Sequence, residues 1–149
     1  MGDGVAPKEI LLIEDDLSLA ELIRLRLSSA GFQVHLAGEG QPGLKQAAEH
    51  RPDLVILDLM LPDMSGYDVC RELRRMYHRW QLPILMLTAL GRPVDELRGF
   101  AHGADAYLTK PYEPDELLST IATLLSETPT SWTLQAPQCY TTDDYGRAF

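Results

Sequence analysis

The chain has 149 residues, 45% of them apolar, and carries a formal net charge of −9 at pH 7. That length fits one domain, and the apolar content is too high for a chain that is disordered throughout. Because an acidic surface repels phosphates, we expect no direct binding of nucleic acid by this chain.

The two cysteines, Cys70 and Cys139, form neither a CxxC pair nor a metal-ligand pattern, which favours free thiols in a reducing compartment. No apolar run is long enough to cross a bilayer, and the N-terminus lacks the layout of a signal peptide. The sequence therefore predicts a cytoplasmic protein with no membrane contact.

Short apolar runs alternate with longer stretches in which apolar residues recur at helical spacing. In chain order, the sequence predicts a strand over residues 9–13 and a helix over 19–31, then a strand over 32–36 and a helix over 41–50. The next predicted pairs are a strand over 53–58 with a helix over 66–79, a strand over 83–88 with a helix over 94–102, and a strand over 105–109 with a helix over 114–126. Five such units predict an α/β fold, a doubly wound five-stranded parallel sheet with helices on both faces.

The composition changes after the last predicted helix, where Pro, Thr, Ser, Asp and Gly become frequent. We therefore divide the chain into an N-terminal extension (residues 1–7), one domain (residues 8–126) and a linker or tail (residues 127–149). Three residues make this tail more apolar than a plain linker needs: Trp132, Leu134 and Tyr140. It could fold back on the domain or meet a partner, although a disordered end is the simpler interpretation.

Side chains suited to chemistry stand at the ends of four predicted strands, namely Glu14, Asp15, Asp58, Thr88 and Lys110. In an open parallel sheet these ends share one edge, where the ligand site lies. Three carboxylates this close repel one another, and a hard cation such as Mg²⁺ with oxygen ligands relieves that repulsion. A carboxylate beside the metal can attack phosphorus, while an ammonium and a hydroxyl contact the phosphoryl oxygens.

Each of these residues also has a purely structural interpretation. Asp15 or Asp16 would cap the first helix, and Asp58 would be a turn residue. Lys110 would be a solvated lysine and Thr88 an ordinary β-branched strand residue. Their joint occurrence at the ends of different strands favours a single functional site.

Four segments resemble the receiver domains of two-component response regulators. They are Ile10-Leu11-Leu12-Ile13-Glu14-Asp15-Asp16, the run from Leu54 through Asp58 to Gly66, Pro83-Ile84-Leu85-Met86-Leu87-Thr88-Ala89, and the run from Gly103 through Lys110-Pro111 to Tyr112. The resemblance covers roughly residues 8–126. It implies a flavodoxin-like sheet with strand order 2-1-3-4-5, as in chemotaxis receivers.

The resemblance also implies roles for individual residues. Asp58 would accept a phosphoryl group from the phosphohistidine of a histidine kinase or a histidine phosphotransfer protein. Mg²⁺ would be held by Glu14, Asp15, Asp58 and the backbone carbonyl of Met60. Lys110 would contact the phosphoryl group.

The same resemblance implies a conformational switch. Thr88 would move towards the phosphoryl group and Tyr107 would turn inward behind it, the structural alternative for Tyr107 being a half-buried strand aromatic. The change would reach the surface formed by helix 4, strand 5 and helix 5 (residues 94–126), through which two copies could pair. The Lys110-Pro111 bond would be cis.

Two features depart from the usual receiver pattern. Met60 and Leu90 are apolar at positions whose side chains, in the family that the chain resembles, flank the path of the hydrolytic water, so we expect a long-lived phosphoryl-aspartate. Ala106 and the segment 119–122 lack the charges through which receivers of winged-helix transcription factors usually pair, which puts that form of homodimer in doubt.

Two other classes of protein remain as alternatives. A pseudo-receiver would be a phosphorylation-independent interaction module, but it would lack Asp58, Lys110 or the acidic pair, and all of these are present. A Mg²⁺-dependent phosphohydrolase would need an acid where Met60 stands. We therefore expect a signalling receiver rather than an enzyme, either standing alone or cut from a longer regulator.

Overall fold

The structure is a computed structural model that describes residues 6–126. The tail at residues 127–149 and its three apolar residues lie outside the described residues, as do residues 1–5 and Cys139. Within the described part, no helix is long and apolar enough to cross a bilayer.

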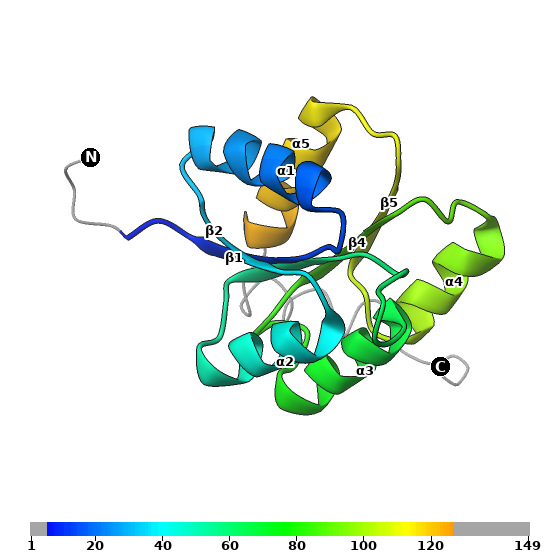
Figure 1. The fold of residues 1–149 in the computed structure, drawn as a ribbon. Helices are drawn as coiled ribbons and strands as arrows, with labels where there is room; N and C mark the ends of the chain where they lie inside the picture. The colour runs from blue at the N-terminus through cyan, green and yellow to red at the C-terminus, as the bar shows by residue number, and fades with distance from the viewer. Residues whose placement is uncertain (1–5, 127–149) are drawn as a thin grey trace, which may run out of the picture.

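One parallel sheet with helices on both faces forms the domain (Figure 1). Its strands are β1 (Glu9–Ile13), β2 (Gln33–Ala37), β3 (Leu54–Leu57), β4 (Ile84–Thr88) and β5 (Ala106–Thr109). The helices are α1 (Leu17–Ser29), α2 (Gly40–Glu49), α3 (Gly66–Met76), α4 (Pro93–Ala101) and α5 (Pro114–Ser126). The strand order β2-β1-β3-β4-β5 confirms the predicted flavodoxin-like fold.

The apolar core is divided into two layers by the sheet. Val55 and Leu57 of β3 face the layer under α2 and α3, whereas Leu54 and Ile56 face the layer under α1 and α5. Because both faces are covered, all four residues of β3 are fully buried. This explains why the central strands appear in the sequence as unbroken apolar runs rather than alternating ones.

The end of α3 differs from its prediction, because the helix stops at Met76 rather than at residue 79. Tyr77 is extended, and its hydroxyl donates a hydrogen bond of 2.7 Å to the carbonyl of Ala47 in α2. The next residue, His78, donates its backbone N–H to the Gln81 side chain at 2.8 Å. These contacts turn the chain towards β4 although the apolar periodicity continues.

Two aspartates cap helix N-termini. Asp16 accepts a hydrogen bond of 3.1 Å from the backbone N–H of Leu19, so the capping interpretation holds for this residue. The other, Asp63, lies in the loop after β3 and accepts from the backbone N–H groups of Gly40 (2.7 Å) and Gln41 (2.8 Å). A residue of a distant loop therefore supplies the cap of α2.

Candidate functional site

Three carboxylates meet at the carboxyl edge of the sheet. Ile13 of β1 and Leu57 of β3 are register partners, so Glu14 and Asp58 leave the sheet side by side. Oxygen atoms of Glu14, Asp15 and Asp58 all lie within 4.8 Å of one another. Glu14 is 3% and Asp58 7% exposed, whereas Asp15 is open to solvent.

Lys110 is the cation of this cluster. Its Nζ lies 2.8 Å from Glu14 Oε1 and 3.0 Å from Asp58 Oδ2. The lysine is anchored because its backbone N–H donates to the carbonyl of Thr88 at 2.8 Å, and the following Lys110-Pro111 bond is cis, as predicted.

Burial and pairing change the protonation behaviour of the cluster. Burial raises the pKa of the Glu14 carboxyl above its ordinary value, and the hydrogen bond from Lys110 only partly offsets that effect. Burial alone would lower the pKa of Lys110, but its hydrogen bonds to Glu14 and Asp58 outweigh it, so the pKa is raised. We take the lysine as charged, because both of its hydrogen bonds end on carboxylate oxygens.

The donor set fits a hard divalent cation. One ammonium faces three carboxylates, so the ionised cluster keeps an excess negative charge that a cation would neutralise. All of its potential ligands are oxygen atoms, which is the chemistry that Mg²⁺ prefers.

The loop after β3 is held close to Asp58. The backbone N–H of Met60 lies 3.2 Å from Asp58 Oδ1, and Met60 pairs with Ser65 in an isolated bridge. A Cβ atom on Gly66 would overlap the backbone of Asp58 and Leu59, so only glycine fits there. The sequence motif contained this glycine, but its packing role becomes clear only from the structure.

Thr88, Leu90 and Tyr107 form a chain of hydrogen bonds on the next strands. Thr88 is fully buried, and its Oγ1 accepts from the backbone N–H of Leu90 at 3.3 Å. The Tyr107 hydroxyl donates to the carbonyl of Leu90 at 2.5 Å. Tyr107 thus points inward, and burial raises the pKa of its hydroxyl to about 12.

Sequence reasoning missed a connection between α3 and α4 that starts beside this site. Tyr67 directly follows Gly66, is buried, and donates its hydroxyl to the carbonyl of Asp95 at 3.0 Å. The guanidinium of Arg98 lies 4.6 Å from the centre of the Tyr67 ring. An aromatic residue in a first helical turn gives no indication of such a partner.

A largely apolar groove of about 460 Å³ runs beside Lys110. It lies between α1 and the segment that leads from β5 into α5, and its lining residues are Leu19, Leu22, Arg26, Lys110, Pro111, Tyr112 and Pro114. Apolar side chains therefore reach the surface next to the carboxylate cluster.

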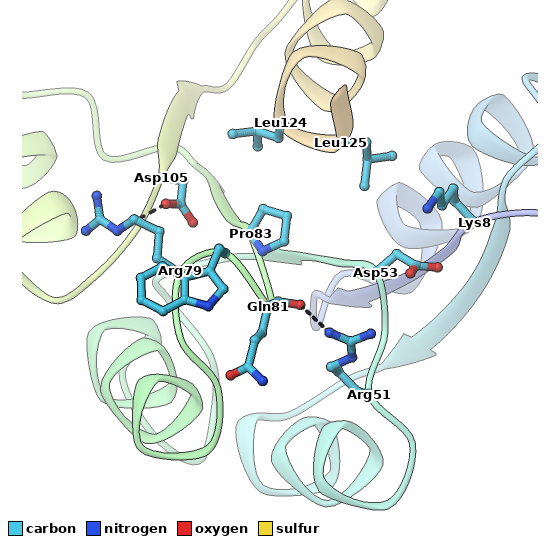
Figure 2. A pocket seen from close by; sticks show the side chains of 10 residues that line it. Lys8, Arg51, Asp53, Arg79, Gln81, Pro83, Asp105, Leu124 and Leu125 are labelled. Atoms are coloured by element: carbon cyan, nitrogen blue, oxygen red, sulfur yellow. Dashed lines mark hydrogen bonds and ion pairs between the residues drawn. The ribbon is translucent and has the colours of Figure 1, made fainter. Parts of the chain in front are cut away.

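A second cavity, of about 170 Å³, lies at the opposite, amino edge of the sheet (Figure 2). Figure 2 shows two arginines of this cavity engaged with neighbours, Arg51 with Gln81 and Arg79 with Asp105. Arg51 donates to the Gln81 carbonyl at 2.9 Å, and Arg79 Nε lies 3.6 Å from Asp105 Oδ1. Asp53 accepts the backbone N–H of Glu9 at 2.7 Å. This cavity is remote from the predicted site residues, so the carboxyl edge remains the candidate site.

Comparison with known proteins agrees with this geometry. The sequence profile of the response regulator receiver domain matches residues 10–122. The chain belongs to this family. Receivers of this family are signalling modules of two-component systems and interact with histidine kinases.

Named relatives of this receiver are transcriptional regulators. It is 44% identical over 119 residues to the DNA-binding dual master transcriptional regulator RpaA of Synechocystis, covering 80% of this chain and 49% of RpaA. It is 39% identical over 118 residues to the alkaline phosphatase synthesis transcriptional regulatory protein PhoP of Bacillus subtilis, covering 79% and 48% of the two chains. The receiver thus spans about half the length of these curated relatives.

Solved structures share the fold of this receiver. A putative response regulator from Chloroflexus aurantiacus superposes with a TM-score of 0.77 at 39% identity, covering 81% of this chain and 99% of that one. The chemotaxis protein CheY4 of Vibrio cholerae gives a TM-score of 0.75 at 32% identity, covering 80% and 100%.

Proposed function

We propose that this receiver takes a phosphoryl group onto Asp58 from the phosphohistidine of a histidine kinase or histidine phosphotransfer protein. The observation that carries the proposal is the contact of Lys110 Nζ with Asp58 Oδ2 at 3.0 Å inside a carboxylate cluster. A carboxylate oxygen of Asp58 forms the new O–P bond while the P–N bond of the donor breaks. The electron pair of that bond stays on the imidazole nitrogen, which takes a proton from solvent.

The other residues of the cluster bind and orient. Glu14, Asp15, Asp58 and the backbone carbonyl of Met60 would hold Mg²⁺, which when bound supplies positive charge against the phosphoryl oxygens. Lys110 would place its ammonium against the same phosphoryl oxygens. Before the transfer, its hydrogen bond to Asp58 holds that carboxylate in position.

The groove beside Lys110 is where we propose that the phosphodonor docks. A donor has to bring its phosphohistidine to Asp58, and this groove is an apolar surface that adjoins Lys110. Leu22 of the groove is 46% exposed, and exposed apolar patches of this kind mark protein interaction sites.

Phosphorylation would be passed on through Thr88 and Tyr107 to the surface formed by α4, β5 and α5. Three apolar residues, Val94, Leu97 and Phe100, are exposed at intervals of three along α4. They would replace the charges that are missing at Ala106 and residues 119–122, so two copies would pair through an apolar contact.

The direct test is intact mass after incubation with Mg²⁺ and acetyl phosphate. A gain of one phosphoryl group that disappears in Asp58→Asn is the expected result. Absence of the adduct, with Mg²⁺ still bound in a titration, would indicate a phosphorylation-independent pseudo-receiver.

We further propose that this receiver acts in the cytoplasm, where histidine kinases present their phosphohistidine, and that it does not itself contact DNA. The match to the DNA-binding relatives covers only about half of their length, and the net charge of this chain is −9. Any effect on transcription would therefore pass through a partner or another domain. A mobility-shift assay with this chain should show no DNA complex at physiological salt.

A further inference from the structure

A cluster of two imidazoles and two carboxylates lies well away from Asp58, at the edge of the sheet formed by β1 and β2. Glu9 opens β1, His35 lies in β2, and His50 follows the last residue of α2. Together they line a cavity of about 190 Å³. Glu49, which lines the same cavity, is a further oxygen donor.

A single carboxylate oxygen is shared by both imidazoles. Glu9 Oε1 lies 3.3 Å from His35 Nε2 and 3.1 Å from His50 Nε2. Zinc bonds to imidazole nitrogen and to carboxylate oxygen are about 2.1 Å long, so two such ligands on one tetrahedral ion are about 3.4 Å apart. Each of the two separations, taken by itself, matches that of two ligands on one ion, whereas the two imidazoles lie too far apart from each other to share it without a movement.

We propose that Glu9, His35 and His50 bind a transition-metal ion of the Zn²⁺ type. Imidazole nitrogen suits such ions, whereas the all-oxygen cluster at Asp58 suits Mg²⁺. The two sites would then select different cations. The ion would join β1, β2 and the end of α2.

Closing this site requires only surface side chains to turn. Among the described residues, Glu14, Asp15 and Asp58 alone bring three ligand atoms within 4.8 Å of one another. One imidazole must therefore move towards the other. His50, whose side chain is 74% exposed, has more room to turn than His35, whose side chain is 43% exposed.

The test is the affinity of the full chain for Zn²⁺, measured by competition with a chromophoric chelator in excess Mg²⁺. The background carries Cys139→Ser, because a thiolate would bind zinc by itself. We expect one Zn²⁺ per chain. His35→Ala and His50→Ala should each weaken Zn²⁺ binding by at least about tenfold. Even mutation of a residue that only hydrogen-bonds to a metal ligand lowers metal affinity about 10–100-fold.

The matched controls are His78→Ala and His102→Ala, which should leave the affinity unchanged. Zn²⁺ should also raise the thermal midpoint of the parent but not that of His35→Ala or His50→Ala. The thermal midpoints of these two variants without Zn²⁺ show whether they fold. Equal affinity in parent, His35→Ala and His50→Ala would overturn the proposal. Loss of binding in Asp58→Asn would assign the ion to the acidic cluster and overturn it as well.

Discussion

The hydroxyl of Tyr107 donates its hydrogen bond to the backbone carbonyl of Leu90, at 2.5 Å. The N–H of the same residue, Leu90, bonds to the Thr88 hydroxyl at 3.3 Å. If Asp58 is phosphorylated as proposed, drawing Thr88 towards the phosphoryl group would alter a turn to which Tyr107 is tied. That would provide a physical route from the carboxyl edge of the sheet to α4.

Replacing Tyr107 with Phe removes that hydrogen bond and keeps the buried ring. We expect the free energy of unfolding to fall by about 0.5–1.5 kcal/mol, the net worth of one hydrogen bond. Phosphorylation by acetyl phosphate should be preserved, whereas pairing induced by beryllofluoride should weaken in size-exclusion runs. Tyr112→Phe, on the opposite face of the sheet, is the control. Unchanged pairing in Tyr107→Phe would contradict the switch role.

The lifetime of the phosphoryl group should be long, because the apolar side chains of Met60 and Leu90 offer no group to orient a water. Phosphate release should take minutes or longer, and loss within seconds would refute the expectation. Met60→Asn should accelerate phosphate release by about tenfold or more, because the amide can orient the attacking water. That gain approaches the rate gains that positioned polar side chains typically provide. Met76→Asn, at the far end of α3, should leave the release time course unaltered.

The groove beside α1 can be tested with two leucines of similar exposure. Leu22 is 46% exposed and lines the groove, while Leu25 is 52% exposed and lies outside its lining. Leu22→Asp should slow phosphotransfer from a histidine kinase or histidine phosphotransfer protein at least about tenfold, which corresponds to a loss of about 1.4 kcal/mol of binding free energy. Transfer from acetyl phosphate should be unaffected, and Leu25→Asp should resemble the parent. Equal loss in both variants would argue against this docking site.

Pairing through α4 should depend on Leu97, which is 68% exposed. Leu97→Asp places a charge in the proposed apolar contact, so the beryllofluoride complex should elute as a monomer. The uncharged variant Leu97→Met should still pair, because it conserves apolar volume. A phosphorylated parent that stays monomeric would remove the dimer from the proposal.

Capping of α2 by Asp63 should make stability depend on pH. The hydrogen bond from Gln41 N–H, together with that from Gly40 N–H, lowers the pKa of the Asp63 carboxyl below its usual value. A carboxyl whose pKa is lower in the folded state stabilises the fold. Its contribution to the free energy of unfolding is full above the unfolded-state pKa of about 3.9 and is lost as pH falls through the folded-state pKa. Asp63→Ala should therefore lower the thermal midpoint at pH 7, and the difference from the parent should shrink below about pH 4.

The neighbouring carboxylate of Glu39 is the control for that measurement. It occupies the N-cap position of α2 but makes no capping hydrogen bond through its side chain. Glu39→Ala should therefore leave the midpoint nearly unchanged at both pH values. A pH-independent effect of Asp63→Ala would show that packing, rather than the carboxylate, supports the helix.

The end of α3 could not be predicted from the sequence. Apolar periodicity extends α3 to residue 79, but the hydrogen bond from Tyr77 to the Ala47 carbonyl ends the helix at Met76. The partner of Tyr77 lies thirty residues away in the chain, at the end of α2. No local pattern encodes such a partner.

By itself, the sequence determined the fold, the strand order implied by the resemblance, and which residues reach the carboxyl edge. Those follow from local periodicity and from the rule that parallel strands end at one edge. Only the tertiary structure decided that Lys110 is shared by Glu14 and Asp58, that Asp63 caps α2, and that Tyr107 is tied to Leu90. These are hydrogen bonds between residues distant in sequence, whose geometry exists only once the layers have packed.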